Sequence, residues 1–170
     1  IFELRKILDD AEGDISISLN ENKIRFMFSR LKIISKVIDG TFPDYTKVIP
    51  QNNNKSFQTN NNNLKNAIDR VSAVAVNEET KSKAIKLTVE NNRLYLSVES
   101  QSKGSANEEI DINYSKDKVE IGFNSRYIID ICNEVDGEEI DINLLDSVSP
   151  AIILDNTDEN LFFVLMPMRI

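Results

Sequence analysis

The chain has 170 residues, of which 41% are hydrophobic and 28% are charged, a composition typical of a globular protein with one full domain and part of another. It contains no histidine, which removes the usual general base and the commonest metal ligand, and its single cysteine excludes an internal disulfide. Its net charge of -8 argues against a surface that holds nucleic acid by broad phosphate neutralisation.

The first 38 residues predict a helix followed by three strands. Apolar residues at positions 2, 4, 7 and 8 roughly share one helical face, and alternating runs follow at 15–19, 24–28 and 31–38. The chain starts with Ile1 and opens directly into the helical pattern, so we expect that residue 1 is not a natural start. Because neither a secretory signal nor a membrane-spanning stretch is recognisable, we expect a cytoplasmic protein.

A connector at residues 39–50 separates this first unit from the rest. Gly40, Pro43 and Pro50 forbid regular structure there, so we place a domain boundary close to Pro50. Residues 1–50 then form half of a domain, and residues 51–170 form a complete one. Half a domain exposes a sheet edge and core surface, which predicts that it is the least stable part.

The order of a helix and three strands recurs twice after the connector. One helix covers residues 64–75 after an asparagine cluster at 60–63, and another covers 125–135, capped by Asn124 or Ser125. The predicted strands lie at residues 85–89, 94–98, 110–114, 119–123, 140–144, 151–154 and 161–166. This repetition indicates an α+β fold of antiparallel sheets with helices on one face, and Cys132 is expected in its core.

Acidic clusters at residues 108–111 and 134–141 are the only obvious candidates for a metal site. Their spacing does not match a calcium loop, and on a strand such as 139–142 the carboxylates alternate with isoleucines, so a solvated face is expected. The serines at 147 and 149 precede Pro150 without a base nearby, which favours a turn.

The C-terminal segment, residues 161–170, is apolar and places Met166 and Met168 on either side of Pro167. Pro167 ends sheet pairing, so the last residues must leave the ladder and lie along the surface. Methionines there suit an adaptable lining that accepts several peptides, whereas a core strand with a frayed end explains the composition equally well.

Four segments resemble the family of the beta sliding clamp of bacterial DNA polymerase III, in order and over essentially the whole chain. They are residues 39–45 (DGTFPDY), residues 120–124 (EIGFN) with Tyr127, residues 146–150 (DSVSP) and residues 164–170 (VLMPMRI). The resemblance implies a DNA-clamp fold and a ring of two head-to-tail subunits, each with three similar domains. This chain would contain the second half of the middle domain and the whole third domain.

The resemblance also implies a non-catalytic protein without a cofactor or metal. Such a clamp tethers polymerase subunits, the clamp loader and repair proteins through a short apolar and acidic peptide motif. The implied peptide site comprises Pro43, Lys47, Val48, Asn124, Tyr127, Val164, Met166, Pro167, Met168, Arg169 and Ile170. Lys47 stands where many members have arginine, so it lacks the planar fork that grips a carboxylate.

An intact ring would encircle double-stranded DNA without sequence preference. The expected channel residues are Arg5, Lys6, Lys65, Arg70 and Arg126, although surface charges that aid solubility are an equal interpretation. Ala73, Val74 and Val76 would contact the other subunit of a homodimer. The alternatives to a clamp are a generic interaction or structural domain and, with less support, a metal-dependent enzyme using the acidic clusters.

Overall fold

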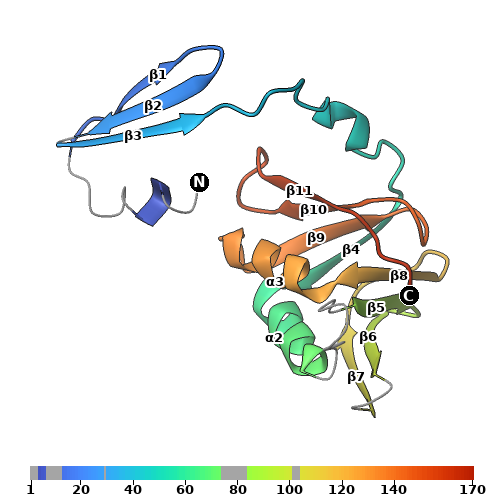
Figure 1. Ribbon diagram of the computed structural model, residues 1–170. Helices are drawn as coiled ribbons and strands as arrows, with labels where there is room; N and C mark the ends of the chain where they lie inside the picture. Colours follow the sequence, from blue (N-terminus) through green and yellow to red (C-terminus); the bar gives the residue numbers. More distant parts are fainter. Residues whose placement is uncertain (1–3, 7–12, 29, 74–83, 101–103) are drawn as a thin grey trace. The chain divides into compact units, whose positions relative to one another are not determined.

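The protein is described here by a computed structural model that covers residues 4–6, 13–28, 30–73, 84–100 and 104–170 (Figure 1). It divides into two compact units, Ile1–Pro43 and Asp44–Ile170, each of which is described by itself. Within the described ranges, no helix is both long and apolar enough to span a membrane.

The first unit is a three-stranded antiparallel sheet in the order β1-β2-β3. Its strands are β1 (Ser16–Leu19), β2 (Lys23–Phe28) and β3 (Leu31–Lys36), as the alternating pattern predicts. The Asn20 side chain holds the first turn by accepting from the amide of Lys23 at 2.8 Å. Residues 4–6 are helical, while the rest of the helix expected at residues 2–8 lies outside the described residues.

One face of this sheet is apolar and open. Ile17 pairs with Phe26, which pairs with Ile33, so the three side chains share a face. Leu19 on the same face is 69% exposed, and among the residues of β1, β2 and β3 only Phe28 is buried. The described part of this unit therefore has no closed core of its own.

The second unit contains two β-α-β-β-β repeats after a short 3-10 helix, η1 (Tyr45–Val48). The first repeat is β4 (Lys55–Asn60), α2 (Asn61–Ser72), β5 (Ala84–Glu90), β6 (Arg93–Ser100) and β7 (Gly104–Asp111). The second is β8 (Val119–Asn124), α3 (Ser125–Glu134), β9 (Glu139–Leu144), β10 (Ala151–Asp155) and β11 (Phe162–Leu165).

The two repeats exchange their leading strands. One antiparallel sheet has the order β11-β10-β9-β4 and the other has the order β7-β6-β5-β8. Because β4 pairs with β9 and β8 pairs with β5, neither sheet can be completed by one repeat alone. The repeats therefore fold as one unit.

Helices α2 and α3 lie side by side against the sheets (Figure 1). Leu64 and Ile68 of α2 and Ile128 of α3 are almost completely buried, with strand residues such as Ile85 and Ile140. Cys132 is also buried in this core, as expected. The predicted α+β architecture of antiparallel sheets and packed helices is confirmed.

Three details differ from the sequence-based expectations. Strand β4 was not predicted, because Phe57 is its only large apolar residue facing the core. The strand expected at residues 110–114 runs instead from Gly104 to Asp111. The connector contains η1, in which Asp44 accepts from the amide of Thr46 at 3.2 Å.

Candidate functional site

The last residues of the chain cross from one sheet to the edge of the other. β11 ends at Leu165, and Pro167, which lacks an amide hydrogen, cannot continue the ladder. The amide of Met168 then donates a 2.7 Å hydrogen bond to the carbonyl of Gly122 in β8. Met166 and Ile170 are 60% and 64% exposed, so this segment lies along the surface as predicted.

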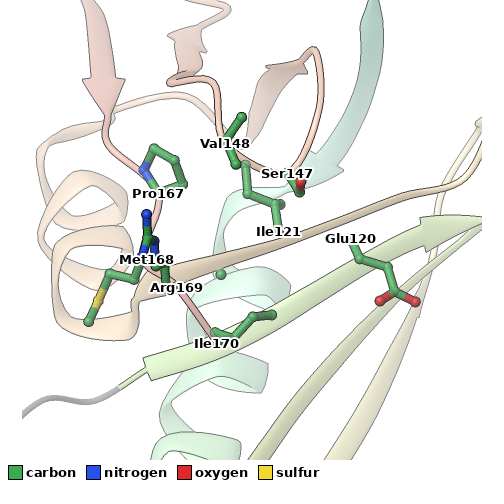
Figure 2. A pocket seen from close by; sticks show the side chains of 9 residues that line it. Glu120, Ile121, Ser147, Val148, Pro167, Met168, Arg169 and Ile170 are labelled. Atoms are coloured by element: carbon green, nitrogen blue, oxygen red, sulfur yellow. The ribbon is translucent and has the colours of Figure 1, made fainter.

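A pocket of about 490 Å³ forms where this segment meets β8 and the loop after β9. Figure 2 shows side chains from all three segments gathered around it. The residues that line it are Glu120, Ile121, Gly122, Ser147, Val148, Pro167, Met168, Arg169 and Ile170. Most of these side chains are apolar, which suits the binding of apolar side chains from a ligand.

The loop that carries Val148 is fixed by Asp146. The Oδ1 atom of Asp146 accepts hydrogen bonds from the amides of Val148, at 2.9 Å, and Ser149, at 2.7 Å. These bonds lower the pKa of the Asp146 carboxyl group below its usual range. Val148 is thereby presented at the pocket with a 75% exposed side chain. The predicted turn is confirmed, because the chain bends at residues 146–149 between β9 and β10.

An ion-pair cluster holds Glu120 at the rim. Its carboxylate lies 2.7 Å from the Nζ atom of Lys86 and 2.9 Å from that of Lys118, which is also 3.3 Å from Glu90. The hydrogen bond from Lys86, followed in size by the one from Lys118, lowers the pKa of Glu120 to about 2. Glu120 therefore stays ionised at neutral pH, and its partners compensate its charge.

A second, more open groove of about 580 Å³ lies between α3 and β11. The α3 side is formed by Tyr127, Asp130, Ile131 and Glu134, whose spacing places them on one helical face. The opposite side consists of residues 162–166. Met166 thus lines this groove and is followed directly by the pocket residues 167–170.

The structure distributes the residues of the expected peptide site over several places. Pro167, Met168, Arg169 and Ile170 line the pocket, whereas Tyr127, Val164 and Met166 line the groove. Asn124 caps α3 by accepting from the amide of Arg126 at 3.0 Å. Lys47 and Val48 belong to η1, and Pro43 is the last residue of the first unit.

Five lining residues of the pocket were not assigned to it from the sequence: Glu120, Ile121, Gly122, Ser147 and Val148. They lie within residues 120–124 and 146–150, two of the segments that carry the family resemblance. Membership of those segments was the signal that could have identified them. Side-chain chemistry alone could not, because a glycine and a serine in a turn suggest no ligand.

The expected DNA-channel residues are placed on helical segments. Lys65 and Arg70 lie on α2, Arg126 lies on α3, and Arg5 and Lys6 lie in residues 4–6 of the first unit. The guanidinium group of Arg70 contacts both carboxylate oxygens of Glu108, with its Nε atom 3.0 and 3.1 Å away. Its charge is therefore already paired.

The expected subunit-contact residues are only partly described. Ala73 is the C-cap of α2, whereas Val74 and Val76 lie outside the described residues. Among the acidic and cysteine side chains in the described ranges, no group of three converges as a metal site.

Comparison with known proteins gives two family matches. The DNA polymerase III beta subunit, C-terminal domain, matches residues 46–169, and the central domain of the same subunit matches residues 1–44. The beta sliding clamp of Caulobacter vibrioides (strain NA1000 / CB15N) is 36% identical over 100% of this chain and 45% of the relative. That of Escherichia coli (strain K12) is 34% identical over 100% of this chain and 46% of the relative.

Solved structures agree with these matches. A DnaN sliding clamp (DNA polymerase III subunit beta) from Bartonella birtlesii, bound to griselimycin, is 40% identical with a TM-score of 0.90. The similarity covers 99% of this chain and 45% of that one. The Caulobacter crescentus pol III beta structure also has a TM-score of 0.90, at 36% identity, and covers 99% of this chain and 45% of that chain. The chain thus spans about half the length of its relatives.

Proposed function

This chain belongs to the family of the DNA polymerase III beta subunit, the bacterial sliding clamps, and we propose that it works as part of such a clamp. In this role it tethers DNA polymerase, the clamp loader and repair proteins to DNA in the cytoplasm and catalyses no reaction itself. Residues 1–50 are proposed to belong to the middle domain of the clamp and residues 51–170 to form its third domain.

The observation that carries this proposal is the composition of the pocket. Residues 120–122, 147–148 and 167–170 are far apart in the sequence but line one cavity, and the same segments carry the family resemblance. A Leu or Phe side chain of a partner peptide would gain roughly 1.5–3 kcal/mol by burial there, before ordering costs. Two such anchors supply about 3–6 kcal/mol, which is less than the roughly 8 kcal/mol of a micromolar complex, so polar and further apolar contacts of an intact clamp must supply the rest.

The proposed peptide site extends beyond the pocket to the neighbouring groove and the connector. Tyr127, Val164 and Met166 supply further apolar surface, while Pro43, Lys47 and Val48 are assigned to it by the family resemblance. Lys47 and Arg169 give the site positive charge for an acidic peptide. The Lys47 side chain is 80% exposed, and its ion pair with Asp44 is long, at 3.7 Å, so its ammonium group remains accessible to a ligand.

Binding to DNA is proposed for the closed ring of two full-length subunits. A ring retains the duplex topologically, so a mildly basic lining is sufficient and is compatible with the net charge of -8. The charge of Arg70 is compensated by Glu108, so in this unit we assign more of the positive charge of the proposed DNA channel to Lys65 and Arg126. The end of α2 at Ala73, with Val74 and Val76, is proposed to face the other subunit.

A binding titration tests the proposal. A fluorescent peptide that starts with Gln-Leu and ends with Leu-Phe is titrated with the chain and with a Met166→Ala, Met168→Ala double variant. We expect saturable binding that the double variant weakens tenfold or more, which equals about 1.4 kcal/mol. The matched control is Met27→Ala, since Met27 is the remaining methionine and lies on β2 of the first unit.

Two results would count against the proposal. Absence of saturable binding would show that this chain does not carry the site by itself. Equal binding of a peptide whose Leu-Phe end is replaced by Ala-Ala would indicate unspecific apolar association and favour a generic interaction domain.

A further inference from the structure

We infer that Gly122 is a positioning residue of the pocket: its missing side chain lets residues 167–170 dock on β8 and form the pocket wall. The expected effect on peptide affinity rests on the proposed function. Docking of residues 167–170 on β8 can be measured without any ligand. Gly122 would thus control binding without offering a side chain to the peptide.

The space above Gly122 is filled by the C-terminal segment. A Cβ atom added at Gly122 would lie 2.3 Å from Cγ2 of Ile170 and 2.7 Å from the carbonyl oxygen of Met168. Carbon atoms do not approach to 2.3 Å without bonding, and the second contact is with backbone, which cannot rotate away. Even an alanine would therefore push this segment off the strand.

The need for glycine does not come from the backbone of β8. Gly122 is not among the described residues with a positive φ, and it pairs with Lys86 within the regular ladder of β5 and β8. Alanine adopts such an extended conformation readily. The conflict created by Gly122→Ala is therefore confined to the C-terminal segment, and the sheet beneath it should persist.

The backbone of the segment makes only a short contact with β8. Its contact with β8 is an isolated bridge at Gly122 and Met168, with one 2.7 Å hydrogen bond, rather than a continuous ladder. Residues 167–170 form one side of the pocket, and residues 120–122 form another. A peptide that contacts both sides must bind the docked arrangement better than the released one, so peptide binding and docking are thermodynamically coupled.

Amide hydrogen exchange at Met168 measures docking directly, because this amide donates to Gly122. In the unchanged chain we expect a protected Met168 amide whose protection increases when the Leu-Phe peptide is added. In Gly122→Ala we expect loss of this protection and peptide binding at least tenfold weaker. Amides of α2 and β6 should exchange as before, since the core is not touched.

The matched control is Gly137→Ala. A Cβ atom there would lie 2.7 Å from Oδ1 of Asp155, so this substitution also creates a close contact, but Gly137 does not line the pocket. We expect it to lower the thermal midpoint while leaving Met168 protection and peptide affinity unchanged. If Gly137→Ala also weakened peptide binding, the weaker binding of Gly122→Ala would be explained by general destabilisation of the fold.

Ile170→Ala supplies a second variant, because Ile170 makes the closest contact. If the clash is the cause, Gly122→Ala should reduce Met168 protection less in the Ile170→Ala background than alone. A Gly122→Ala chain that keeps Met168 protected and binds the peptide normally would overturn the inference. If the unchanged chain binds no peptide, the proposed function fails, whereas the exchange data still decide whether Gly122 positions the segment.

Discussion

Asn60 and Asn124 occupy equivalent places in the two repeats of the second unit, each ending a strand and capping the helix that follows. Oδ1 of Asn60 accepts from the amide of Asn63 at 3.0 Å, and Oδ1 of Asn124 accepts from the amide of Arg126 at 3.0 Å. The next residue in each repeat, Asn61 or Ser125, is buried. Asn61 also donates to the carbonyl of Cys132 at 3.0 Å, which ties the start of α2 to the end of α3.

The cap at Asn60 leads to the first prediction. Asn60→Ala leaves the Asn63 amide without its acceptor, so we expect the free energy of unfolding to fall by about 1 kcal/mol. Asn60→Asp keeps an oxygen acceptor and should remain close to the unchanged chain. Urea unfolding followed by circular dichroism measures both variants, and equal loss in the two would show that the cap is not the cause.

The sequence predicts elements well where two or more apolar residues alternate. Strands β5, β6, β9 and β10 and both helices of the second unit were found in this way. β4 was missed because only Phe57 and Thr59 face the core. One aromatic residue does not make the apolar–polar alternation from which a strand is predicted. Its pairing with β9, a long-range contact, decides the structure of this segment.

The candidate site could be predicted only in part, for a different reason. The C-terminal methionines stand out by composition, and the family resemblance assigns them to a peptide site. The contribution of Gly122 depends on the distance between two segments that are remote in sequence, and no local pattern encodes it. The ion pairs of Glu120 with Lys86 and Lys118 likewise follow from strand register.

A second prediction compares the substitution of leucine by alanine at a buried position and at an exposed position. Leu64 on α2 is fully buried, whereas Leu19 on β1 is 69% exposed. Leu64→Ala should lower the free energy of unfolding by about 2–5 kcal/mol, because it removes buried methyl groups and leaves a cavity. Leu19→Ala should change it by less than about 0.5 kcal/mol. Urea titration of both variants checks the difference, and a large effect at Leu19 would show that the open apolar face is covered in solution.

The third prediction concerns the thiol of Cys132. Burial raises its pKa to about 11. At pH 8 only about 0.1% of such a thiol is ionised, and the thiolate is the reactive form. We expect its reaction with a chromogenic disulfide reagent to be at least about 100-fold slower in the folded chain than in concentrated guanidinium. Rapid labelling of the folded chain would instead indicate that α3 opens frequently.

The fourth prediction uses the depressed pKa of Glu120. Because its folded-state pKa is about 2 and its ordinary value is 4.5, the ion pairs with Lys86 and Lys118 stabilise the fold above about pH 5. That contribution is lost as the pH falls from about 4.5 towards 2, when Glu120 becomes protonated. Glu120→Gln lacks it at every pH. The thermal midpoints of the two proteins should therefore differ most near neutral pH and converge in acid.

Two comparisons make this prediction specific to the ion pairs. Glu139→Gln, at the exposed start of β9, removes the same charge outside the cluster and should not reproduce the pH-dependent difference. High salt should reduce the effect of Glu120→Gln, since exposed charges are screened over about 3 Å at 1 M ionic strength. A difference in thermal midpoint that stays constant between neutral pH and pH 2 would mean that Glu120 stabilises the fold through packing. In that case the charge of its carboxylate would not matter.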